Sequence, residues 1–216
     1  MRHWGAGPDF DYGPSIKAAV SAAQAVHPEA TVLFYTDDYD IDLPCLTIRL
    51  PLGKELGLNR TRTWAAHARA WHGPTLHIDS DIIIRRRFDP VFAREFDFAW
   101  SWRPPSDPFM ARMPINGGML LQKSGPDTAA FLDDMAEQIE ALARINRRPG
   151  WLTAGGEQLA LGLMLYGCQP GKHKTPWGTC GVFYADNGPK WKGINHTYDG
   201  TNDGQFADHY KGQRKL

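Results

Sequence analysis

Apolar positions along the chain switch repeatedly between the period of a helix and the short runs of a buried strand. Residues 31–36 (TVLFYT) are β-branched and aromatic, which is typical of a buried strand. Residues 16–26 place apolar side chains at helical spacing before that strand. The segment 46–50 predicts a second short strand, which ends at Pro51. The chain therefore begins as an alternation of helices and strands.

The same alternation continues to residue 166. Ser124 and Asp127 have the spacing of a capping box, and Phe131, Met135 and Ile139 then line one face of a predicted helix. The other predicted elements are helices over 60–71 and 156–166, strands over 75–84, 96–102 and 117–122, and a Pro-rich loop over 103–113. After residue 167 the chain is rich in Gly, Pro, Trp and Lys and shows few periodic segments.

This pattern predicts an α/β fold with a mostly parallel central sheet flanked by helices. A length of 216 residues suits a single large α/β domain and is short for two. We therefore expect one domain over 1–216, with a nucleotide-binding N-terminal half and a C-terminal part that closes the site.

Composition and charge exclude several classes of function. The formal net charge is zero, whereas a dedicated nucleic-acid binder is usually basic. Three cysteines with no short-range pairing are typical of reduced thiols. No apolar run approaches the length of a membrane span, and the first residues lack an apolar signal core. We expect a cytoplasmic protein without a transmembrane segment.

The strongest chemical signal is an acid pair inside an apolar stretch, TLHIDSDIII. Asp79 and Asp81 follow a predicted strand directly, with Ser80 between them. Buried carboxylates need a partner, and oxygen ligands suit Mg²⁺ or Mn²⁺. In sheets of this kind, ligands lie beyond the carboxyl ends of the strands. The alternative is a plain turn in which one carboxylate makes a surface ion pair.

Further segments carry polar or glycine residues at suggestive spacings. They are DFDY at 9–12, RTR at 60–62, PINGGMLL at 114–121, GGEQ at 155–158 and ADHYKGQRK at 207–215. Each has a simpler reading: a polar turn, solvated arginines, a β-bulge, an acid favoured by a helix dipole, and an exposed histidine. These simpler readings explain each segment alone, but they explain less easily why all five occur together with the acid pair.

Taken together, these segments resemble the GT-A nucleotide-sugar glycosyltransferases, most closely the retaining glycosyltransferase family eight. The resemblance implies that Asp79, Asp81 and His209 hold a divalent metal ion, Mn²⁺ or Mg²⁺. It also implies that Asn116, Glu157 and Gln158 line the donor sugar, with glutamate standing where the family has aspartate. The implied donor-binding residues are Asp9, Tyr12, Arg62, Ser80, Gly117, Gly212 and Lys215. The segment 2–7, in the place of the family's first strand, is poorly apolar.

The function implied is metal-dependent transfer of a hexose from a nucleotide sugar, expected to be a UDP-sugar, to a saccharide or other hydroxyl acceptor, with retention. The sequence also allows two alternatives. One is a non-catalytic nucleotide- or sugar-binding protein with the same fold, and the other is a different Mg²⁺-dependent phosphate-ester enzyme. The sequence does not reveal the donor sugar, the acceptor or the oligomeric state, and nothing in it favours a nucleic-acid partner.

Overall fold

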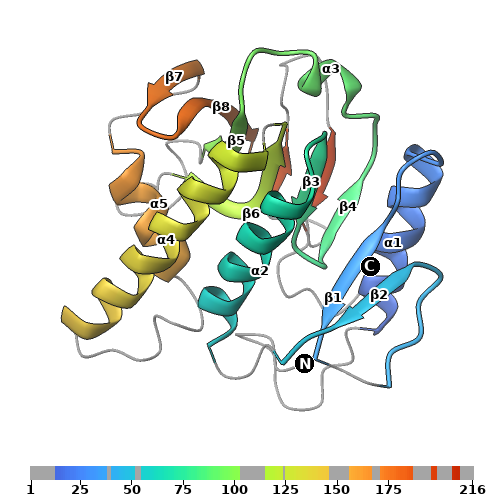
Figure 1. The fold of residues 1–216 in the computed structure, drawn as a ribbon. Helices are drawn as coiled ribbons and strands as arrows, with labels where there is room; N and C mark the ends of the chain where they lie inside the picture. Colours follow the sequence, from blue (N-terminus) through green and yellow to red (C-terminus); the bar gives the residue numbers. More distant parts are fainter. Residues whose placement is uncertain are drawn as a thin grey trace.

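The computed structural model of the chain (Figure 1) describes most of the segments in which elements are predicted. The described residues are 13–37, 40–51, 55–102, 115–123, 125–145, 156–166, 171–186, 196–198 and 206–209. Of residues 182–186, 196–198 and 209, only the backbone is described. The segment 2–7 and the loop predicted over 103–113 lie outside these residues.

The helices occur where the apolar period predicts them. They are α1 (Gly13–Val26), α2 (Leu56–Ala70), the short α3 (Asp89–Phe92), α4 (Gly125–Ile145) and α5 (Gly156–Met164). Helix α2 begins four residues before the predicted start, because Leu58 is buried and belongs to the same apolar face as Trp64. On α4, Phe131, Met135 and Ile139 are all buried, which confirms the predicted face.

The strands of the first two thirds are also confirmed, except that the one strand predicted over 75–84 is two strands, separated by the turn that carries Asp79 and Asp81. They are β1 (Leu33–Thr36), β2 (Leu46–Arg49), β3 (Thr75–Ile78), β4 (Ile82–Ile84), β5 (Phe98–Trp102) and β6 (Ile115–Gln122). Four more follow, where the sequence shows few periodic segments: β7 (Gly171–Thr175), β8 (Gly178–Asp186), β9 (His196–Tyr198) and β10 (Ala207–His209). Strands β9 and β10 have three residues each, which is too short for a period to show.

Eight of these strands form the main sheet, in the order β3-β6-β5-β8-β9-β10-β4, with β7 paired to β8. The α/β class with a central sheet flanked by helices is confirmed, but the sheet is mixed and not mostly parallel. Among the described strands of this sheet, only β5 and β8 pair in parallel. The remaining parallel pair, β1 with β2, forms a separate two-stranded sheet in the described part of the chain.

The mixed pairing has a simple cause. The prediction assumed that a helix between two strands returns the chain to the same end of the sheet. Strands β7 and β8 are instead joined by the two residues 176–177 and pair antiparallel, and β5 pairs antiparallel with β6, the next strand described along the chain. Short connections of this kind reverse the chain and produce antiparallel neighbours.

The main core lies between the sheet and two long helices. Helices α2 and α4 run side by side across one face of the sheet, and α5 packs against α4 (Figure 1). The rings of Phe98 on β5 and Phe131 on α4 stack at 4.6 Å, and Trp100 is fully buried beside them. Burying one such side chain contributes about 1.5–3 kcal/mol. This packing fixes α2, and with it the arginines that α2 carries.

Helix α1 packs on β4, with Ala23 and Val26 in the same cluster as Ile82 and Ile84. Its residues Ile16 and Val20 form a second cluster with Leu43 and with Phe34 of β1. No helix in the part of the chain that the structure describes is long and apolar enough to cross a membrane.

A buried histidine makes the stability of this core depend on pH. His77 on β3 lies under Trp64, and its Nε2 is 3.3 Å from Oε1 of Gln122. Burial is the main cause that lowers the pKa of His77 from 6.5 to about 3, partly offset by Gln122. Below pH 6.5 the unfolded chain takes up this proton before the folded chain does. The contribution that neutral His77 makes to the free energy of unfolding is therefore fully present above pH 6.5, and it is lost as the pH falls toward 3.

We expect the free energy of unfolding to decrease by up to about 1.4 kcal/mol per pH unit on account of His77 between pH 6.5 and pH 3. Urea unfolding at pH 7, 6, 5 and 4 measures this slope, and His77→Gln should flatten it. The exposed His72 provides the control, because His72→Gln should keep the wild-type slope. An unchanged slope in His77→Gln would contradict the assignment.

Candidate functional site

The predicted acid pair lies in the turn that joins β3 to β4. Asp79 follows β3 directly, and its backbone N–H donates to the carbonyl of Gly118 on β6 at 2.9 Å. The turn is closed by the N–H of Ile82, which donates to the carbonyl of Asp79 at 3.1 Å. Asp81 sits between these residues, and both carboxylates are half-buried. The strand end thus presents two acids over the edge of the sheet, as the sequence predicts.

One arginine connects this turn to two helices. Arg60 on α2 donates from Nη1 to Oδ1 of Asp79, and from Nη2 to Oε1 of Glu157 on α5 at 3.3 Å. Its guanidinium carbon also lies 4.9 Å from the centre of the Trp64 ring, a cation–π contact. The Arg60 side chain is 25% exposed. A single cation therefore links α2, the acid turn and the first turn of α5.

The charges around Arg60 keep it protonated. Burial alone would lower the pKa of Arg60, but the negative charges of Asp79, Glu157 and Asp81 outweigh burial and raise the pKa. Arginine is charged at all physiological pH values even without such help. The guanidinium is therefore a permanent positive charge beside the acid turn.

Three buried polar atoms at this place have no hydrogen-bond partner among the described residues. One is Nε of Arg60, and the other two are Nδ2 of Asn116, a donor, and Oε2 of Glu157, an acceptor. The second polar atom of the Asn116 and Glu157 side chains is used: Oδ1 of Asn116 accepts from the N–H of Gly118 at 2.8 Å, and Oε1 of Glu157 accepts from Arg60. Leaving a buried polar atom unsatisfied costs about 1–3 kcal/mol. A bound molecule with hydroxyl groups would remove that cost at Asn116 and Glu157.

Gly117 allows β6 to approach α5 closely. A Cβ atom at this position would lie 3.3 Å from Cγ of Gln158 and 3.6 Å from Cγ of Glu157. The pairing of β5 with β6 also shifts here, from Trp100 opposite Leu120 to Ser101 opposite Asn116. The ladder is therefore irregular where the sequence suggested a β-bulge, and this irregularity lies next to the unsatisfied atoms of Asn116 and Glu157. Bulges of this kind are over-represented beside active sites.

The far end of the chain reaches the same turn through β10. This strand pairs antiparallel with β4, with Asp208 opposite Ile83 and His209 opposite Ile82. Ile82 is the residue that follows Asp81 in the chain. The backbone of His209 is thus brought next to the acid pair, although the two segments are separated by most of the sequence.

The predicted metal ligands are Asp79, Asp81 and His209. Among the side chains that the structure describes, no group of three or more His, Cys, Asp or Glu residues is placed to hold a metal ion, and the His209 side chain is not one of these. Two carboxylates one residue apart in a turn, with the backbone of a histidine beside them, fit the donor set of Mn²⁺ or Mg²⁺.

Arg62, which the family resemblance implies as a donor-binding residue, pairs with a residue away from the acid turn. It is exposed, and its Nη2 donates to Oε1 of Glu140 on α4 at 2.6 Å. Arg60 takes the position beside Asp79. Helical phase could have identified Arg60, because it stands one turn before the buried Trp64, whereas Arg62 is turned about 200° away from Arg60.

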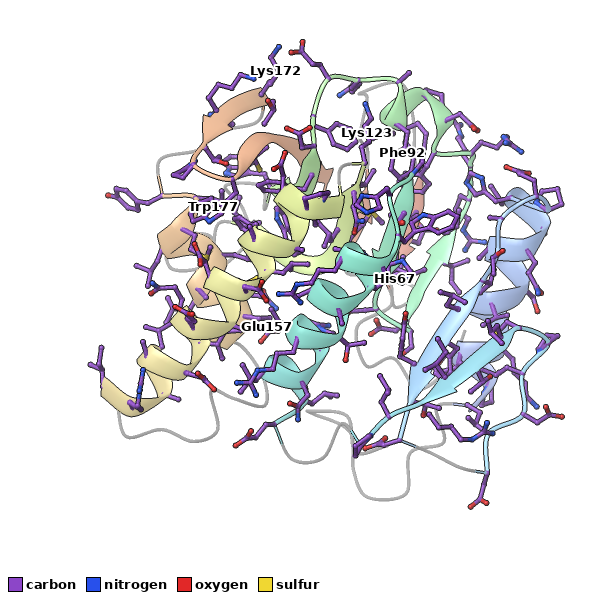
Figure 2. The ribbon with its side chains drawn as sticks, in the orientation of Figure 1. His67, Phe92, Lys123, Glu157, Lys172 and Trp177 are labelled. Atoms are coloured by element: carbon purple, nitrogen blue, oxygen red, sulfur yellow. The ribbon has the colours of Figure 1, made fainter. Side chains whose placement is uncertain are left out.

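The other predicted site residues fall into two groups. Ser80 lies in the acid turn, and Gln158 is half-buried on α5 beside Gly117. Those outside the described residues, which stay predictions, are Asp9, Tyr12, Gly212 and Lys215. Figure 2 labels Glu157, which lies on the α4 side of α2, and His67, which lies on the side of α2 that faces β1.

Solved structures provide a comparison for this arrangement. The chain is similar to a galactosyltransferase. The structure of galactosyltransferase LgtC in complex with donor and acceptor sugar analogues aligns with a TM-score of 0.48 and 14% identity, over 82% of this chain and 70% of that chain. An active-site mutant of LgtC aligns with a TM-score of 0.45 and 13% identity over the same shares.

No protein-family model matches the chain, and no curated protein matches it.

The two arginines of α2 provide a matched test of the site's electrostatics. Arg60→Met removes the partner of two partly buried carboxylates, Asp79 and Glu157, and we expect it to lower the free energy of unfolding by about 3 kcal/mol. Arg62→Met removes an exposed ion pair and should cost less than about 1 kcal/mol. Urea unfolding at pH 7 gives both values. Equal losses in the two variants would show that Arg60 is not the central charge.

Proposed function

We propose that this protein is a glycosyltransferase of the GT-A type that moves a hexose from a nucleotide sugar, a UDP-sugar, to a hydroxyl acceptor with retention of configuration. One observation carries the proposal. The acid turn, a permanent cation, the buried atoms of Asn116 and Glu157 that lack partners among the described residues, and the backbone of His209 are all linked to the turn between β3 and β4. Each of these elements matches a different part of a nucleotide sugar.

A divalent ion, Mn²⁺ or Mg²⁺, would be held by Asp79, Asp81 and His209. When bound, such an ion neutralises charge on the diphosphate that leaves. The carboxylates supply the negative charge that this ion needs, and the pairing of β10 with β4 supplies the approach of the histidine.

Arg60, which pairs with Asp79, would add a positive charge beside the donor without being a ligand of the metal ion. Its guanidinium presents several N–H donors in a fixed fork, which suits phosphate and hydroxyl oxygens. Because Asp79 and Glu157 already hold this fork, binding of the donor would not have to order it first. Positive charge placed in advance where negative charge develops is a large source of rate acceleration.

The sugar itself would be recognised by the unsatisfied atoms of Asn116 and Glu157. Nδ2 of Asn116 can donate to a sugar hydroxyl, and Oε2 of Glu157 can accept from one. Gln158 lies beside them across Gly117, where the absence of a side chain leaves room. Removing a hydroxyl that such atoms bind leaves them buried and unpaired again, and this cost gives the site its selectivity for a sugar.

The transfer itself exchanges one bond for another. The bond from the anomeric carbon to the diphosphate oxygen breaks, and a bond from the acceptor oxygen to the same carbon forms. In a retaining reaction on one face, the leaving diphosphate oxygen accepts the proton of the acceptor hydroxyl. The sugar passes through a state with oxocarbenium character, as in glycoside hydrolysis. Glu157 stays paired with Arg60 and orients the sugar.

A screen of UDP-sugars tests the proposal without knowledge of the acceptor. We expect slow hydrolysis of one UDP-hexose in the presence of Mn²⁺, with loss of activity when the ion is chelated. Calorimetry with UDP, with and without Mn²⁺, measures binding separately. Binding of UDP that depends on metal, with no turnover of any UDP-sugar, would favour a non-catalytic binding protein. Absence of binding would exclude both.

Substitutions in the acid turn and in β10 test the roles of individual residues. We expect Asp81→Asn and His209→Ala each to reduce turnover by at least about 100-fold, because each removes a stabiliser of the leaving charge. The free energy of unfolding should change little. Asp133→Asn, an exposed acid paired with Arg69 on the far side of α2, is the control and should keep full turnover. Either site variant with near wild-type turnover would exclude the mechanism.

A further inference from the structure

In the proposed function, strand β10 holds His209 beside the acid pair, but this strand is short. It spans Ala207–His209, and the residues on both sides of 206–209 are not described. Three residues make few ladder hydrogen bonds, and a strand held by the ladder alone can slip by one residue. If His209 is to stay in one position, another interaction must therefore fix the register of β10 on β4.

The residues at the end of β4 hold β10 from one side. The backbone N–H of Arg85 donates to the carbonyl of Phe206 at 2.7 Å, and the N–H of Arg86 donates to the same carbonyl at 3.3 Å. The Phe206 ring is buried against Phe88 at 5.3 Å. These contacts anchor the start of β10, but they act on the residue before it and do not by themselves fix Asp208.

A charged pair acts on β10 itself. Nε of Arg85 donates to Oδ2 of Asp208 at 2.8 Å. The side chain of Asp208 is only 6% exposed, whereas that of Arg85 is 46% exposed. A carboxylate this deeply buried is costly without a cation beside it, so the register that pairs the two residues is favoured over others.

The register follows from the alternation of side chains along a strand. Asp208 stands opposite Ile83, and Arg85 is two residues beyond Ile83, just past the end of β4, where its side chain reaches Asp208. A slip of one residue would send the carboxylate of Asp208 to the other face, away from Arg85, and would move His209 one place along β4. The ion pair therefore distinguishes the observed pairing from its neighbours.

We propose that Arg85 and Asp208 are positioning residues of the metal site: their ion pair sets the register of β10 on β4 and so holds the backbone of His209 beside Asp81. This inference rests on the proposed function, because it gives the register a purpose only if His209 binds the metal ion. It adds residues that contact neither metal nor sugar, and that act through His209.

The experiment compares the affinity for Mn²⁺ in the full chain saturated with UDP, by electron paramagnetic resonance of free Mn²⁺. We expect Arg85→Met to weaken Mn²⁺ binding about tenfold or more, the usual effect of removing a residue that orients a ligand. Arg85→Lys keeps the charge and should restore most of that loss. The control is Arg87→Met, because Arg87 pairs with Asp89 and Glu29 and not with β10.

A second variant separates positioning from stability. In Arg85→Met alone, Asp208 is left buried without this partner, and the midpoint of thermal unfolding should fall. The double variant Arg85→Met, Asp208→Asn removes the buried charge, so the midpoint should recover while Mn²⁺ binding stays weak. Recovery of both quantities together would mean that the pair serves stability alone and would overturn the inference.

The remaining outcomes also separate the two proposals. Wild-type protein and Arg85→Met that bind Mn²⁺ equally would overturn the positioning role and leave the proposed function standing. Wild-type protein that binds no Mn²⁺ in the presence of UDP would overturn the proposed function and this inference with it.

Discussion

The site depends on one partly buried cation. The guanidinium of Arg60 is held by Asp79 from the acid turn and by Glu157 from α5, and it lies against the ring of Trp64. Without it, two partly buried carboxylates would face each other in a region of low dielectric, where like charges repel strongly. The packing of α2 on the sheet therefore has an electrostatic consequence, because it delivers the charge that allows the acids to converge.

The same interaction explains why the polar atoms of the site remain available. Arg60 binds Oε1 of Glu157, and the backbone N–H of Gly118 donates to Oδ1 of Asn116. Oε2 of Glu157 and Nδ2 of Asn116 have no partner among the described residues. Each side chain is thus held through one polar atom, and its second polar atom is available to a ligand. Such half-satisfied groups cost stability in the free protein, and a site that tolerates this cost is organised before its ligand arrives.

Much of the fold could be predicted from the sequence, because long amphipathic segments identify themselves. Phe131, Met135 and Ile139 marked the buried face of α4, and the acid pair was placed at a strand end. The direction of pairing was not predictable, since it is set by connection lengths such as the two residues between β7 and β8.

For the site, the sequence predicts which residue types are present better than which residues pair with each other. The backbone of His209 does approach the acid turn, but through the three-residue strand β10, which carries no periodic signal. Arg62, the arginine that the family resemblance implies, pairs with Glu140, whereas helical phase directs Arg60 to Asp79. Charge partners such as Arg85 and Asp208 lie far apart in the chain, and no local pattern pairs them.

Strand β4 consists of three consecutive isoleucines, and its neighbour in the main sheet is β10. Because β4 is the last strand in the order of this sheet, β10 is its paired neighbour among the described strands. If β10 detached, β4 would be an unpaired segment of high β-propensity and no charge, the kind of segment on which chains associate into fibrils. The strand that brings the backbone of His209 to the acid turn therefore also protects β4 from association with other chains.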